Sequence, residues 1–160
     1  MPKHPLFDLI KNEPLFHSLV EKYGTPLYVY SKDRLIHNIQ TLDQALGDHF
    51  ESHHICYTIK ANSNPHLIQA LKSTIPALGA DCASPGEIAI SGKCGIVGNE
   101  CIYTGNYESP NDLSYALETG AHINLDDISS FHRLKRIGLP KDISFRLNSR
   151  SGPPPPPPPP

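Results

Sequence analysis

The stretch of sequence that indicates the fold reads His54-Ile55-Cys56-Tyr57-Thr58-Ile59-Lys60-Ala61-Asn62-Ser63-Asn64-Pro65. Its first half is rich in β-branched and aromatic residues, which favour a strand. The asparagines and Pro65 that follow mark a turn. Lys60 stands directly at this boundary, although a buried ammonium is costly unless it is paired or neutralised. The position of Lys60 therefore needs a chemical explanation.

In partly dry surroundings at the C-terminal mouth of a parallel strand, burial would lower the pKa of the Lys60 amine and make it nucleophilic. Such a lysine can form a Schiff base with a carbonyl compound, including pyridoxal phosphate. From spacing alone the alternative stays open that Lys60 simply points into water, since lysine is rarely buried.

Strand-like and helix-like segments alternate along the rest of the chain. Strand-like runs recur every roughly 22 residues, near 54–59, 78–82, 101–104, 122–125 and 142–147. The segments between them carry helix signals, of which the clearest are the capping sequences that begin at Ser31, Ser84 and Ser109, a cap at Asp127 or Ser129, and stops at Gly120 and Gly138. Alternating strands and helices predict right-handed βαβ units and a parallel sheet. No G-x-G-x-x-G follows a strand, which weakens a dinucleotide-binding interpretation.

The ends of the chain differ from this pattern. We expect residues 1–30 to form a loose lead-in with one short helix and a first strand at 27–30, and residues 31–152 to form a partial barrel. The eight prolines at 153–160 cannot form a central strand and predict an extended polyproline II tail. The chain therefore looks like the front of a larger protein, cut short or abnormally ended.

Composition excludes several classes of function. The net charge of −2, with both signs mixed along the chain, argues against nucleic acid or an acidic membrane surface as a partner. No apolar run is long enough to span a bilayer, and we expect a cytoplasmic protein. The four cysteines lack the spacing of a zinc site, and most are expected to be small buried hydrophobes.

The segment Tyr57–Asn62 resembles the lysine motif of the fold-type III pyridoxal-phosphate-dependent decarboxylases, which act on diaminopimelate, ornithine, arginine and related amino acids. Further segments resemble this family in the same order, namely 25–30, 79–88, 123–127 and 145–148. The resemblance covers roughly residues 25 to 148 and implies an α/β fold, an incomplete (β/α)8 TIM-type barrel of the alanine-racemase-like kind with about five to six of the eight units.

The resemblance also implies a cofactor, a substrate class and an assembly. The cofactor would be pyridoxal 5'-phosphate (PLP), the substrate a small amino acid, and the full-length form a homodimer. The family's later motifs have no match in this chain. These are a histidine that stacks on the ring, a glycine-rich phosphate loop, a glutamate for the pyridine nitrogen and a cysteine from the partner subunit.

The resemblance gives roles to particular residues. Lys60 would form the Schiff base with PLP. Asp81 would lie beside the cofactor, pairing with the lysine or orienting the ring, and its alternative is a simple turn or cap residue. Thr58 shares a strand face with Lys60 and could line the pocket near the ring, or it is a β-branched core residue.

Arg146 lies in the last apolar run, where a guanidinium needs an anionic partner or access to the mouth of the site. The family places it near the cofactor as a positive group. The alternative is a structural salt bridge to Asp126 or Asp127. Glu87 is interpreted as the capping partner of Ser84.

We prefer meso-diaminopimelate as the substrate, because residues 25–30 and 57–64 look most like that branch, which serves lysine biosynthesis. Residues 81–84 lean toward the ornithine branch, so an ornithine- or arginine-type decarboxylase of polyamine biosynthesis stays open. A third hypothesis is a catalytically incomplete fragment whose polyproline tail binds a partner, with Arg150 supplying the flanking charge. A PLP-dependent racemase is disfavoured by the segment 81–87.

Overall fold

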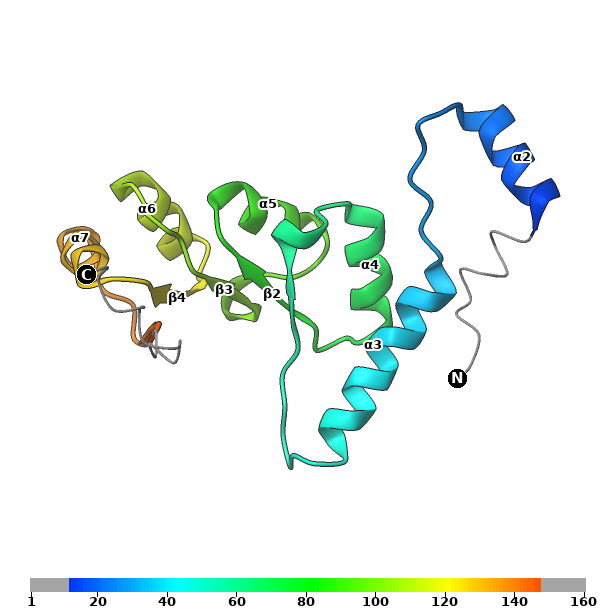
Figure 1. Cartoon of the computed structure of the whole chain (residues 1–160). Coiled ribbons are helices and arrows are strands. Elements are labelled where there is room, and N and C mark those ends of the chain that lie inside the picture. Colours follow the sequence, from blue (N-terminus) through cyan, green and yellow to red (C-terminus); the bar gives the residue numbers. More distant parts are fainter. Residues whose placement is uncertain (1–11, 148–160) are drawn as a thin grey trace, which may run out of the picture.

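The computed structural model describes residues 12–147, in which a parallel sheet is covered by helices (Figure 1). The strands are β1 (Cys56–Thr58), β2 (Gly79–Cys82), β3 (Cys101–Tyr103), β4 (His122–Leu125) and β5 (Ile143–Phe145). The helices are α2 (Glu13–Tyr23), α3 (Lys32–Gly47), α4 (Pro65–Thr74), α5 (Pro85–Lys93), α6 (Pro110–Glu118) and α7 (Ile128–Ile137), with short 3-10 turns η1 (Ile59–Ala61) and η2 (Gly98–Glu100).

The strands pair in the order β1-β2-β3-β4-β5, and every pair is parallel. Because each strand pairs with the next one in the sequence, right-handed crossovers place all of the connecting helices on the same side of the sheet. A doubly wound sheet instead reverses its strand order and has helices on both faces. The sequential order is therefore that of a barrel wall, and the predicted incomplete (β/α)8 barrel is confirmed with five strands.

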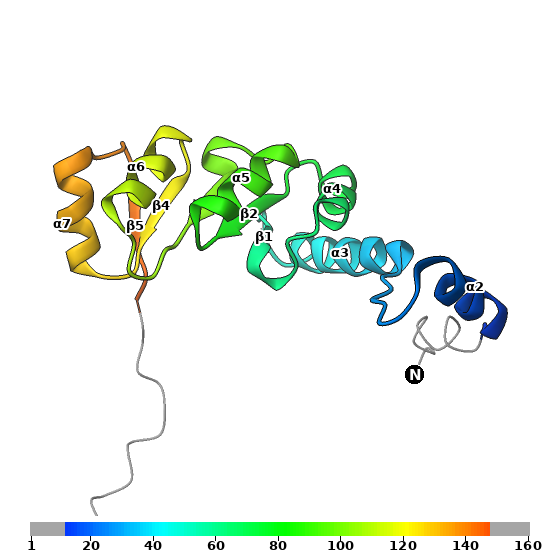
Figure 2. The ribbon, with the colours of Figure 1, turned by 90° about the horizontal axis from the view of Figure 1, so that it is seen from above.

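The two faces of the sheet differ in chemistry. The face toward helices α4–α7 is apolar and buried, and its strand residues are Ala80, Cys82, Cys101, Tyr103, Ile123 and Leu125. Figure 2 shows these helices side by side along the sheet. The residues that alternate with them on the strands are half-buried and mostly polar, including Thr58, Asp81, His122, Asn124 and Ser144. This second face, which we call the inner face, corresponds to the inside of a barrel.

Four helices begin at the residues that the capping patterns predict. Ser31, Ser84, Ser109 and Asp127 each accept a hydrogen bond from the first turn of α3, α5, α6 and α7, respectively. A side-chain oxygen at this position satisfies a backbone N–H that has no partner within the helix. For the last helix the sequence left a choice between two caps, and the structure selects Asp127. Backbone hydrogen bonds from Ser130 and Ser129, together with the Ser130 hydroxyl and Arg133, hold the pKa of Asp127 below its ordinary value.

One predicted strand is wrong. Residues 27–30 are extended but pair with no strand of the sheet, and Tyr28 is 87 % exposed. They lie between α2 and α3, at the N-terminal end of α3 and away from the strands (Figure 1), so their β-branched and aromatic residues have no partner strand there. The predicted short helix of the lead-in is present as α2, which has no buried residue.

Other predictions concern residues 1–11 and 148–160, including the polyproline tail, which lie outside the described residues. Within residues 12–147 no helix is long and apolar enough to cross a membrane. The same part of the chain contains no group of three or more His, Cys, Asp or Glu side chains that could hold a metal ion.

Gly79 provides a test of how tightly the first two strands are packed. A Cβ at this position would meet the His54 ring, the Glu100 carbonyl oxygen at 2.6 Å and Cys56 Sγ at 2.9 Å. We therefore expect Gly79→Ala to lower the free energy of unfolding by about 1–3 kcal/mol through overpacking, measured by urea denaturation. The control Gly92→Ala has open space within 4 Å and is expected to be neutral or stabilising by about 0.5 kcal/mol. Equal stability of the two variants would contradict this packing.

Candidate active site

Lys60 lies where the sequence predicts it, at the C-terminal end of β1, but the local structure differs. The strand ends at Thr58, and Lys60 is in the 3-10 turn η1 with its side chain exposed. The expected partly dry surroundings are therefore wrong for the described chain. The buried side chain of this turn is Ile59, which packs in the core. Among residues 12–147 the Lys60 ammonium forms no ion pair.

Thr58 and Asp81 are brought together on the inner face. They are register partners of β1 and β2, and Thr58 Oγ1 donates a hydrogen bond to Asp81 Oδ2 at 3.0 Å. Asp81 is inside β2, and Ser84 is the cap of the following helix, so the turn or cap interpretation of Asp81 is wrong. Thr58 is not part of the buried core either. The hydroxyl of Thr58, two residues before Lys60, instead holds the Asp81 carboxylate in place.

Arg146 directly follows β5 and is not buried. Its Nη1 lies 3.3 Å from Asp126 Oδ1, and its side chain is 53 % exposed. Its backbone N–H donates to the Leu125 carbonyl, which continues the pairing of β4 and β5 by one residue. The alternative to a cofactor role, an ion pair with Asp126 or Asp127, is present with Asp126. It lies at the C-terminal ends of the strands, as Lys60 does. Because an exposed pair of this kind contributes little stability, the guanidinium is available to an anionic ligand.

Sequence reasoning missed four further polar residues of the inner face. Asn124 Nδ2 donates to Thr104 Oγ1 at 3.0 Å, Ser144 Oγ donates to Asn124 Oδ1 at 2.8 Å, and His122 Nε2 lies 2.9 Å from Ser144 Oγ. The signal was present as polar residues at alternate positions of two strands, 122 and 124 in β4 and 144 and 146 around β5. We call Thr104, His122, Asn124 and Ser144 the inner-face chain.

Burial keeps the cysteine next to this site in its thiol form. Desolvation, and secondarily the Asp81 carboxylate, raise the pKa of Cys56. Because the thiolate is the nucleophile, this cysteine is a poor one. Cys82 and Cys101 are buried and form no disulfide, as predicted for small hydrophobes, whereas Cys56 is only half-buried; Cys94, for which there was no such prediction, is buried as well.

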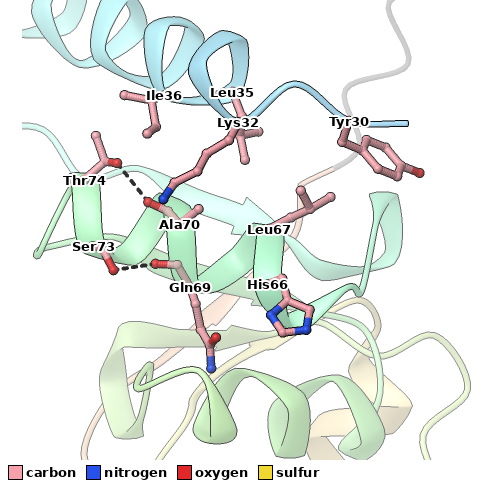
Figure 3. Close-up of a pocket in the computed structure, with 10 residues that line it drawn as sticks. All are labelled: Tyr30, Lys32, Leu35, Ile36, His66, Leu67, Gln69, Ala70, Ser73 and Thr74. Atoms are coloured by element: carbon pink, nitrogen blue, oxygen red, sulfur yellow. Dashed lines mark hydrogen bonds between the residues drawn. The ribbon is translucent and has the colours of Figure 1, made fainter. Parts of the chain in front are cut away.

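A cavity of about 480 Å³ between α3 and α4 is a separate feature (Figure 3). It is lined by helix residues such as Leu35 and Leu67, and by none of the predicted site residues. The Ser73 and Thr74 hydroxyls in its wall already donate to carbonyls of their own helix. This cavity is on the helical side of the sheet and does not reach the strand ends, so it is not the site of the chemistry.

Comparisons with known proteins show the family to which the chain belongs. Residues 32–152 match the family described as pyridoxal-dependent decarboxylase, pyridoxal binding domain. The chain belongs to the pyridoxal-dependent decarboxylases. It is 34% identical over 134 residues to diaminopimelate decarboxylase of Thermoplasma acidophilum, and 35% identical over 136 residues to that of Methanothermobacter thermautotrophicus. Each alignment covers 84% of this chain, and 32% and 31% of the respective relative.

Solved structures of pyridoxal-dependent decarboxylases have the same fold. The crystal structure of diaminopimelate decarboxylase from Helicobacter pylori, complexed with L-lysine, aligns with a TM-score of 0.65 at 27% identity over 76% of this chain and 30% of that one. Lysine decarboxylase from Selenomonas ruminantium aligns with a TM-score of 0.70 at 23% identity, covering 85% of this chain and 34% of the other, and supports the fold alone. The chain thus spans about a third of the length of the relatives it matches.

The residues present fit the group from which the family takes its name. PLP is an aldehyde that carries a phosphate and a pyridine ring, and it needs an amine to attach to and charged groups to orient it. The ends of β1, β2 and β5 supply an exposed amine at Lys60, a carboxylate held by a hydroxyl at Asp81 and a guanidinium at Arg146. All three are at the C-terminal ends of the strands, where barrel enzymes place their active sites.

Proposed function

We propose that this chain is the PLP-binding part of a PLP-dependent amino-acid decarboxylase, a carboxy-lyase, and that its substrate is meso-diaminopimelate. The observation that carries the proposal is the set of Lys60, Asp81 and Arg146 at the C-terminal ends of β1, β2 and β5, within the matched pyridoxal-binding domain. When bound, PLP supplies an electron sink for the electrons released as carbon dioxide leaves the substrate.

The residues of the chain perform three tasks in this proposal. Lys60 holds the cofactor through its amine and is exposed, so the aldehyde can reach it without a rearrangement of the core. Asp81, fixed by Thr58, places a negative charge beside the bound cofactor. Arg146 holds an anionic group of the cofactor or substrate while Asp126 limits its movement.

The substrate assignment is supported by the relatives. Both of those quoted above carry the name diaminopimelate decarboxylase. Decarboxylation of ornithine or arginine is the second candidate, because the segment 81–84 leans toward that branch. A cytoplasmic location and a homodimeric full-length form stay predictions from the sequence.

The experiment that tests the proposal is attachment of PLP followed by borohydride reduction and peptide mass spectrometry of the 160-residue chain. We expect a single pyridoxyl group on Lys60. Labels spread over surface lysines, with no preference for this residue, would contradict the proposal. Release of carbon dioxide from carboxyl-labelled meso-diaminopimelate or ornithine, with PLP present, then distinguishes the two substrates.

A further inference from the structure

The inner-face chain joins three strands by hydrogen bonds that have a direction. Asn124 is its centre, with its amide nitrogen toward Thr104 and its amide oxygen toward Ser144. An amide oxygen only accepts hydrogen bonds, so Ser144 must give its single hydroxyl proton to Asn124. His122 Nε2, which is 2.9 Å from Ser144 Oγ, must then carry a proton and donate it. The donors therefore run from His122 through Ser144 to Asn124.

At the other end of the chain, Thr104 accepts from Asn124 and keeps its own hydroxyl proton. Within residues 12–147 the hydrogen bonds of the structure give this proton no acceptor. Its backbone is held in place, because the Thr104 N–H donates to the Cys82 carbonyl oxygen at 2.9 Å. Thr104 thus presents a hydrogen-bond donor on a fixed backbone, directly after β3.

Thr104 and Lys60 follow the same row of register partners by the same number of residues. Thr58, Asp81, Ile102 and His122 are partners across β1 to β4. Two residues after the first three of these come Lys60, Ala83 and Thr104, each just beyond the end of its strand and Lys60 in the turn η1. Two residues after His122 comes Asn124, which is still inside β4 and is the partner of Ser144 on β5. The residue that follows the intervening strand β2 at this offset is Ala83, whose side chain is only a methyl group. We therefore expect no bulky side chain at this offset between a ligand attached to Lys60 and the Thr104 hydroxyl.

We propose that Thr104 is a ligand-binding residue whose hydroxyl donates to an anionic oxygen of the molecule attached at Lys60. Phosphate and carboxylate oxygens have the required chemistry, and a hydrogen bond to a charged acceptor is stronger than one between neutral groups. The inference rests on the proposed function and adds to it a residue and a contact. Asn124 acts as a positioning residue, because its amide decides whether the Thr104 proton is available.

The experiment compares PLP binding by variants that remove, keep or redirect the Thr104 proton. Thr104→Val has the same shape but no hydroxyl, and we expect its PLP dissociation constant to rise about tenfold. Thr104→Ser keeps the hydroxyl and is expected to bind like the original chain. Asn124→Asp replaces the amide donor by an acceptor that takes the proton of Thr104, so binding should weaken by a similar factor although Thr104 itself is unchanged.

Two further ligands identify the oxygen. Weaker binding of PLP with unchanged binding of pyridoxal, which lacks the phosphate, assigns the contact to the phosphate. A loss seen only when the amino acid is present with PLP assigns it to the carboxylate. If Thr104→Val and Asn124→Asp bind PLP and the amino acid like the original chain, the proposal is wrong.

The experiment on Thr104 can fail independently of the proposed function. Failure of the original chain to attach PLP at Lys60 overturns both proposals, whereas attachment with no effect of Thr104→Val overturns only this one. Circular dichroism shows whether each variant is folded. If Thr104→Val does not fold, Asn124→Asp gives the answer with the threonine still in place.

Discussion

Lys60→Ala is expected to abolish covalent attachment of PLP to the chain. The alanine methyl cannot condense with an aldehyde, and no other amine of the described residues is at the strand ends of the inner face. Because the Lys60 side chain is exposed, we expect the free energy of unfolding to change by no more than about 0.5 kcal/mol. The measurement is the yield of pyridoxyl label after borohydride reduction, with thermal melting as the test of folding.

The matched control for this change is Lys93→Ala. Lys93 is the last residue of α5 and is also exposed, but it is on the helical side of the sheet. Its removal takes away one lysine and should leave the label on Lys60 intact. Retention of most of the label by Lys60→Ala, or a similar loss in both variants, would show that the amine at the end of β1 is not the attachment point.

Arg133→Leu is expected to give the largest loss of stability, about 3 kcal/mol. Glu108 precedes α6 and its residue is only 5% exposed. Its Oε2 accepts a hydrogen bond from Ser130 at 2.7 Å and lies 3.6 Å from Arg133 Nη2. Burial, and secondarily the Glu108 charge, raise the pKa of Tyr103, so this tyrosine stays a neutral phenol near the carboxylate. Removing the arginine would leave a buried carboxylate without a cation.

Urea denaturation measures this effect, and a second variant identifies its origin. The double variant Glu108→Gln with Arg133→Leu removes both charges and should recover most of the lost stability, because the cost comes from the unpaired buried carboxylate and not from the loss of contacts. If the single and double variants are equally destabilised, the arginine acts through packing of its aliphatic part instead.

Much of the fold could be predicted from the sequence, because the signals are local. Serine caps followed by proline and an acidic residue mark the starts of α5 and α6, an aspartate cap marks the start of α7, and short, mostly apolar runs mark the strands. Residues 27–30 show the limit of such signals. Their composition favours a strand, but a strand also needs a partner, and the composition of four residues contains no information about a neighbouring strand.

The site was predicted only in part, because only some of its features depend on local sequence. Lys60 and Asp81 each follow an apolar run, so their place at the strand ends could be inferred. The hydrogen bond between Thr58 and Asp81 depends on the register of β1 and β2, and the pairing of Asn124 with Ser144 on that of β4 and β5. Register arises from the packing of the whole sheet and is not encoded in any one segment. The exposure of Lys60 likewise depends on what surrounds the strand end.

The sequential strand order implies the order in which the sheet can assemble during synthesis. Every strand pairs with the one translated just before it, so the sheet can grow at its newest edge while later residues are still on the ribosome. Thr58 and Asp81 meet once the first βαβ unit, 56–82, is complete. Asp126 and Arg146 meet only after β5 has emerged. The anionic half of the site therefore forms early in translation, and the guanidinium that complements it arrives last.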